Sequence, residues 1–234
     1  KHSSKKMEVP GVTVVAERVC DTCYELHSSG TKDNVLRYLL VLDHEEDLSS
    51  KKKGLLFKGI ANTLEEYARN IGVFQDKEKV HVTDEDRSPV APTRLMDDAS
   101  KGAHSGGFQR ICDFVMEAPG ETATTQVEMY RCLAAAIEAY SVESAHGENH
   151  VVTTLLDGML EKLGDAMQEG RAPERALTYI LKPFKDFGKA PMVQQTAREK
   201  KVLSKISDLL MSNDEKVQEV AVVAMASLQH DCTP

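Results

Sequence analysis

The clearest hydrophobic pattern in the chain lies over residues 202–230. Apolar residues recur there every three or four positions, on both sides of a polar turn at 212–215. They are Val202, Leu203, Ile206, Leu209 and Leu210 before the turn, and Val217, Val220, Ala221, Ala224 and Leu228 after it. This spacing lines one face of an α-helix. The segment therefore predicts two amphipathic helices folded back on each other.

Similar periodicity covers most of the remaining chain. The predicted helices span 10–28, 32–42, 50–71, 108–117, 122–141, 148–168, 173–187 and 192–211. Pro10 suits a first helical turn and Gly72 suits a helix end, whereas Pro183 predicts a kink or a boundary. Residues 1–9 are polar and basic, which predicts a frayed terminus. Short connections between about nine or ten helices favour antiparallel packing of consecutive helices.

The segment 73–107 breaks this pattern. It is dense in charge, contains Pro89 and Pro92, and ends in a glycine-rich stretch. Val80 and Val82 would allow only a short strand. We expect an irregular loop here, which divides the chain into helical repeats at 10–72 and at 108–234.

The pair of helices at 202–230 resembles a repeat of the HEAT or armadillo type. Asp214 after the turn, followed by Val217, Ala221, Ala224 and Leu228, occupies the positions that these repeats use. Gln218 departs from their pattern, because a basic residue often stands there. Residues 35–68 repeat the pattern more loosely. The resemblance implies an all-α fold of stacked antiparallel helical pairs, an α-solenoid, that serves as a scaffold or adaptor and has no catalytic residues.

Composition narrows the possible classes of protein. Aromatic residues make up only 5% of the chain and tryptophan is absent, which argues against β-sandwiches and barrels. The formal net charge of −8 makes nucleic acid an unlikely partner, and Lys51-Lys52-Lys53 is interpreted as a solvated helix start. No apolar run reaches the ~20 residues of a membrane span. Five scattered cysteines predict a reducing intracellular compartment, cytoplasm or nucleus.

Three short motifs could carry chemistry. Cys20, Cys23 and His27 would share one side of a helix, but structural zinc needs four ligands, and a redox pair needs a helix N-terminus. We therefore interpret these cysteines as packing residues. His146 and His150 have metal-compatible spacing without a supporting motif, and the glycine-rich stretch 102–107 lacks the features of a phosphate loop. The sequence thus predicts no catalytic residue, metal or cofactor.

These observations favour a non-enzymatic scaffold that binds another protein, as a segment or subunit of a larger assembly. The acidic residues are the predicted contacts: Asp43, Glu45, Glu46, Asp47, Asp84, Glu85 and Asp86. The pair at 202–230 should also expose an apolar edge, with Val223 or Met225 on its outer side. Two alternatives remain: an all-α bundle enzyme or cofactor carrier with a site in its core, and an RNA-associated helical-repeat protein.

Overall fold

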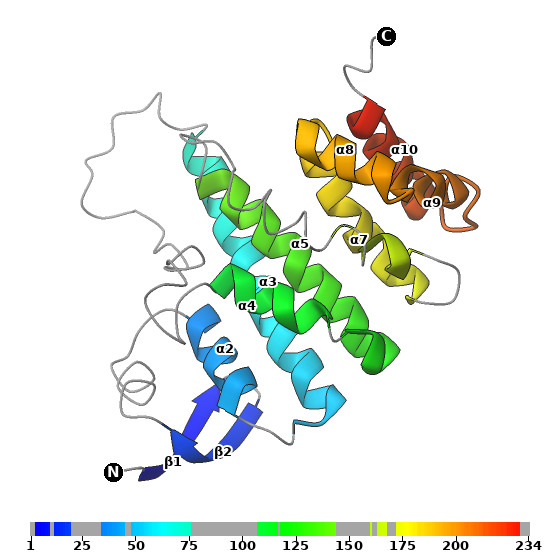
Figure 1. Ribbon diagram of the computed structural model, residues 1–234. Coiled ribbons are helices and arrows are strands. Elements are labelled where there is room, and N and C mark those ends of the chain that lie inside the picture. The colour runs from blue at the N-terminus through cyan, green and yellow to red at the C-terminus, as the bar shows by residue number, and fades with distance from the viewer. Residues whose placement is uncertain are drawn as a thin grey trace.

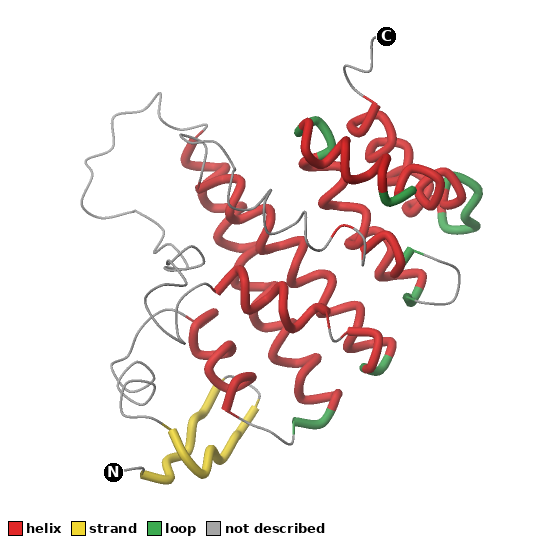
Figure 2. The backbone as a smooth tube through the Cα atoms, in the orientation of Figure 1, coloured by secondary structure: helices red, strands yellow, loops and turns green. Residues whose placement is uncertain are grey.

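A computed structural model describes residues 3–9, 12–19, 34–44, 48–75, 107–116, 118–143, 160, 163–167 and 172–229. These residues form a helical molecule with one two-stranded antiparallel hairpin at its N-terminal end (Figures 1 and 2). The strands are β1 (Ser3–Val9) and β2 (Val12–Val19). The helices are α2 (Asn34–His44), α3 (Ser50–Gln75), α4 (Gly107–Met116), the 3-10 turn η2 (Ala118–Gly120), α5 (Ala123–Glu143), α7 (Glu174–Phe187), α8 (Pro191–Glu199), α9 (Val202–Leu209) and α10 (Glu215–Gln229).

The helices form two layers. We call α3, α5, α7 and α10 the front layer, and each of these helices packs against the next in that order. The back layer contains α2, α4, the described residues 163–167 and α9, and α8 lies beside α9 and α10. Each of α2, α4 and α9 packs against a front-layer helix that follows it closely in the chain. The predicted pairs 32–42 with 50–71 and 202–211 with 215–230 are therefore present.

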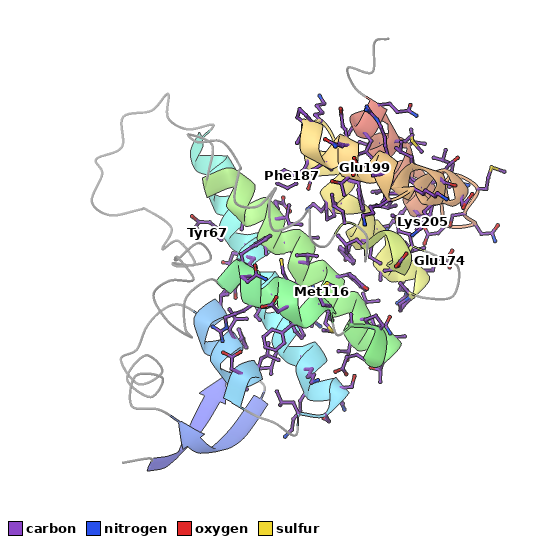
Figure 3. The ribbon with its side chains drawn as sticks, in the orientation of Figure 1. Tyr67, Met116, Glu174, Phe187, Glu199 and Lys205 are labelled. Atoms are coloured by element: carbon purple, nitrogen blue, oxygen red, sulfur yellow. The ribbon has the colours of Figure 1, made fainter. Side chains whose placement is uncertain are left out.

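Neighbouring helices of the front layer run in the same direction. Ser50 and Thr125 meet at the N-terminal ends of α3 and α5, while Glu65 and Arg131 meet further along both helices. Glu174 and Phe187 mark the two ends of α7 in Figure 3, and Figure 1 shows that α7 follows the direction of α5. Parallel neighbours require the chain to return between them. The back layer supplies these returns, so the predicted stack of helical pairs is confirmed.

One continuous hydrophobic core lies between the layers. Leu39 of α2, Phe57 of α3 and Ile111 of α4 are all at most 1% exposed. The rings of Phe57 and Phe114 meet edge to face, with centroids 5.9 Å apart and planes at 74°. A fully buried side chain of this size stabilises the fold by about 1.5–3 kcal/mol relative to an exposed one. Burial of the rear of α3 leaves its opposite face free for solvent.

Glycine allows two of the closest helix contacts. A Cβ added at Gly59 of α3 would lie 2.5 Å from Cζ of Tyr38 on α2, and the Tyr38 side chain is itself buried. A Cβ added at Gly188, after α7, would lie 2.8 Å from Cβ of Ser227 on α10. Both distances are shorter than carbon atoms tolerate, so each contact depends on the missing side chain.

The predictions for the N-terminal end were wrong. Residues 3–9 form a strand instead of a frayed terminus, and Val12–Val19 forms a strand instead of part of a helix at 10–28. The two strands pair from Val9 opposite Val12 to Ser3 opposite Val19. The run Val12-Thr13-Val14-Val15 is β-branched throughout, which favours extended backbone once a partner strand is available. Residues 20–28, with Cys20, Cys23 and His27, lie outside the described residues.

Several predicted boundaries also need correction. Helix α3 continues through Gly72 to Gln75, and α7 continues through Pro183. The predicted helix 192–211 is two helices, α8 and α9, which separate at Lys200 and Lys201, where Lys201 adopts a left-handed φ of 56°. Of the predicted helix 148–168, only 160 and 163–167 are described, and 160 and 163–166 are helical. Most of the predicted loop 73–107 lies outside the described residues.

Candidate protein-interaction surface

Among the predicted acidic contacts, the structure describes Asp43 alone. Asp43 lies in the last turn of α2, and its carboxylate forms an ion pair with the guanidinium of Arg110 on α4. The pair ties two back-layer helices together, so this carboxylate already has a structural partner. Glu45, Glu46, Asp47 and the group Asp84, Glu85 and Asp86 lie outside the described residues. Their role in binding stays a prediction.

Arg131 of α5 is the main polar tie within the front layer. Its Nε and Nη2 donate to the two carboxylate oxygens of Glu65 on α3, at 2.8 and 2.6 Å. Nη2 also donates to Oδ1 of Asn62, and Nη1 donates to Glu128. The hydrogen bond to Glu65 contributes most to raising the pKa of Arg131. Because a bidentate pair fixes geometry as well as distance, it holds α3 and α5 in register.

Hydroxyl groups connect the adjacent N-terminal ends of α3 and α5. The Ser50 hydroxyl accepts a hydrogen bond from the backbone N–H of Thr122, and the Thr125 hydroxyl donates to the carbonyl of Ser50 at 2.8 Å. Beside them, Lys53 Nζ donates to Glu121 at 2.6 Å. Burial raises the pKa of Glu121, but hydrogen bonds from Lys53 and Ser50 outweigh burial and lower it overall. Lys53 is therefore used within the fold.

Other basic side chains remain without an ion pair among the described residues. On α3 these are Lys51, Lys52, Lys58 and Arg69; on and just after α7 they are Arg175, Lys185 and Lys189. All seven are exposed. Lys182 of α7 differs, because its Nζ lies 2.6 Å from Glu138 of α5 and ties these helices together. The basic segment interpreted as a solvated helix start thus contains one structural lysine, Lys53, and two free ones.

A separate pocket of about 360 Å³ opens where α4, η2, α5 and residues 163–167 meet. Apolar side chains form most of its wall, including Val115, Leu163 and Met116, which is labelled in Figure 3. Tyr130 and Asp165 supply the polar groups, and Asp165 is paired with Lys205 at 2.6 Å. Burial raises the pKa of Tyr130, so its phenol stays protonated at neutral pH.

Reactive groups are sparse in the described part of the chain. No three His, Cys, Asp or Glu side chains there gather closely enough to hold a metal ion. Cys112 and Cys132 are buried free thiols, and burial raises both pKa values, that of Cys112 to about 12. Thiols in such surroundings are poor nucleophiles. None of the described helices has the length and hydropathy of a membrane span.

The predicted apolar edge of the last helical pair is present in part. Val222 and Val223 of α10 are 57% and 41% exposed, and Met211 in the preceding turn is 84% exposed. Met225, which the sequence suggested as an outer residue, is partly buried against the core instead. The last described front-layer helix therefore presents valine side chains to solvent.

Comparisons with known proteins give a structural neighbour. Among solved structures, the chain is similar to a designed armadillo repeat protein, with 16% sequence identity over 89% of this chain and 86% of that chain. The TM-score is 0.39, so the likeness concerns the helical fold and adds nothing about function. Neither the search of protein families nor that of curated proteins found a match.

Proposed function

We propose that this protein is a non-catalytic scaffold that binds another protein through the solvent-exposed face of its front layer. The single observation that supports the proposal most is the construction of that layer. Helices α3, α5 and α7 lie side by side and in parallel, and ion pairs join each helix to the next. Their rear faces are buried in one core. Such a layer is a rigid platform, and rigidity reduces the entropy lost on binding.

The chemistry of the platform supports binding better than catalysis. Its exposed positions carry mostly polar and charged side chains, with Leu55 as an apolar exception, and these are spread over several helices instead of forming a converging group of titratable residues. A catalytic site would need an acid, base or nucleophile positioned within hydrogen-bond reach of one reacting atom. A binding surface needs only complementary shape and charge over a larger area.

The test is site-specific photocrosslinking in native extract. A photoreactive residue is placed at Glu66 or Lys185, both exposed on the front layer, or at Asp113 or Asp208, both exposed on back-layer helices. We expect the two front-layer positions to crosslink a common partner protein and the two back-layer positions to fail. Equal crosslinking from both layers, or crosslinking from the back layer alone, would show that the front layer is not the contact surface.

A further inference from the structure

Helix α3 presents one narrow stripe of exposed side chains, which we call the α3 stripe. Its members recur at intervals of three or four residues along α3 and therefore share one helical face. They are Lys51, Leu55, Lys58, Asn62, Glu66 and Arg69, and every one is exposed. At 1.5 Å per residue the stripe is about 27 Å long. It lies on the solvent side of the front layer, beside α5.

The positive charges of the α3 stripe are unpaired in the described part of the chain. Two other basic residues of this region, Lys53 and Arg131, are used in ion pairs with Glu121 and Glu65, which join α3 to the α5 segment. No described carboxylate pairs with Lys51, Lys58 or Arg69. The stripe has one acidic member, Glu66, so its formal charge is +3 − 1 = +2. This is opposite in sign to the whole chain, whose formal net charge is −8.

A bulky apolar side chain stands within this basic stripe. Leu55 is 45% exposed, and it follows Lys51 by one helical turn and precedes Lys58 by another. The other large exposed apolar residues of the described chain lie far away in sequence, at 211–223. An apolar side chain of a partner could pack on Leu55 and bury its exposed apolar surface, which is favourable in water. Lys51 and Lys58, one helical turn away on either side, could form ion pairs with acidic residues that flank this apolar side chain.

We propose that the α3 stripe binds an acidic segment of a partner protein that carries one bulky apolar side chain. This inference rests on the proposed function and names the chemistry of the partner. The apolar side chain packs on Leu55, and carboxylates on both sides of it pair with Lys51, Lys58 and Arg69. Charge complementarity sets the register of the bound segment along α3 and raises the association rate, and the apolar contact slows dissociation.

Two other polyanionic partners fit the stripe less well. A nucleic acid needs a dense row of phosphate-binding cations, whereas Glu66 and Leu55 interrupt this one and the remaining chain is acidic. An anionic membrane surface needs an amphipathic helix with a broad apolar face. The stripe has a single apolar residue, and the rear of α3 is already buried against the core.

The test uses a fluorescein-labelled peptide of glutamate and aspartate with one central leucine, measured by fluorescence anisotropy against the full chain. Two further peptides replace the leucine by serine or the acidic residues by lysine. The stripe variant is Lys51→Glu/Lys58→Glu/Arg69→Glu. The matched control is Lys189→Glu/Lys201→Glu/Lys216→Glu, which makes the same change in net charge at exposed residues outside α3 and outside the crosslinking positions. Circular dichroism confirms that both variants fold.

We expect the stripe variant to bind the leucine peptide at least about tenfold more weakly than wild type, and the control to stay within about threefold, because nearby charge pairs decide complementarity. Leu55→Ser should weaken the leucine peptide and leave the serine peptide unchanged. Binding should also fall with added salt. Equal losses in the stripe and control variants, or tighter binding of an RNA duplex or of phosphatidylserine vesicles to the wild-type stripe, would overturn the inference. If that happens while the front-layer crosslinks persist, the scaffold proposal stands without this partner.

Discussion

At the scale of single residues, a missing methyl group sets the separation of α2 and α3. Gly59 permits the ring of Tyr38 to lie where a β-carbon would otherwise stand. Tyr38 is buried and α2 packs on the core, so neither can move away at low cost. Burial also raises the pKa of the Tyr38 phenol, which keeps this contact uncharged well above neutral pH.

Replacing Gly59 by alanine should lower the free energy of unfolding by about 1–3 kcal/mol, the usual cost of overpacking a core. Urea denaturation followed by circular dichroism measures this loss. Gly120→Ala is the matched control, because a Cβ at Gly120 meets nothing within 4 Å. Alanine favours helix more than glycine does, so propensity alone would not cause a loss. A stability loss of the same size in both variants would therefore show that the contact with Tyr38 is not its cause.

Cys112 and Cys132 allow a second prediction at this scale. The folded chain should protect both thiols from iodoacetamide, which attacks the thiolate, and denaturant should expose both. The measurement is mass spectrometry of a variant in which Cys20, Cys23 and Cys232 are serine.

The unfolded thiol of Cys112 ionises near its ordinary pKa of 9.0, whereas the folded thiol holds its proton to about 12. Stability should therefore fall as pH rises above about 9. Rapid alkylation of the folded chain would mean that α4 and α5 separate readily.

At the scale of helices, Asp214 fixes the start of α10. Its Oδ1 accepts hydrogen bonds from the backbone N–H groups of Lys216 and Val217, at 2.9 and 3.3 Å. These N–H groups have no partner within the helix, so a side chain must satisfy them. Gln218 adds a hydrogen bond to the carbonyl of Ser212, which closes the turn between α9 and α10.

Asp214→Ala should therefore cost about 0.5–2 kcal/mol of stability, as loss of an N-terminal cap usually does. Thermal unfolding of the variant measures the cost, and Asp208→Ala, which removes an exposed aspartate within α9, serves as the control. If Asp208→Ala is equally destabilising, the loss reflects net charge and not the cap.

The sequence predicted the helices that carry their own start and stop signals. The pair at 202–230 has a capping aspartate, a polar turn and two clear apolar faces, and it is present as predicted. The strand Val12–Val19 was missed because its valines fit a helical spacing as well as an extended one. The choice depends on pairing with β1, which no local pattern reveals. The break between α8 and α9 was missed because neither Lys200 nor Lys201 is a turn-forming residue.

At the scale of the whole molecule, the described part of the stack has apolar side chains in water on its last helix, α10. Val222 and Val223 are exposed because no further front-layer helix in the described chain covers α10. Terminal units of helical stacks normally need a polar outer face to stay soluble. The double variant Val222→Ser/Val223→Ser should therefore reduce concentration-dependent association in sedimentation velocity without loss of stability.

Glu219→Ser/Gln229→Ser, at exposed polar positions of the same helix, provides the comparison for the valine variant. It should leave association unchanged. A wild-type chain that sediments as a monomer at every concentration would contradict the prediction.

The interaction surface shows the limit of sequence reasoning at this scale. Lys51, Lys52 and Lys53 look equivalent in the sequence. Lys53 alone forms an ion pair with Glu121, which lies about seventy residues away in the chain. Which lysines stay free depends on where α5 packs. The acidic residues that composition suggested as contacts include Asp43, whose carboxylate is already paired with Arg110. Charges that hold the fold and charges that face a partner can be separated only once the layers are known.

The parallel order of the front layer has an electrostatic consequence. Each helix has a macrodipole worth about half an elementary charge at either end, positive where the helix begins. The returning helices of the back layer offset part of these fields, but along the exposed face the beginnings of α3, α5 and α7 lie at one edge and their ends at the other. The platform therefore has a positive and a negative rim, with Lys51 near the positive one. A negatively charged segment that binds along the platform would therefore prefer the orientation that puts its most acidic end at the rim where the helices begin.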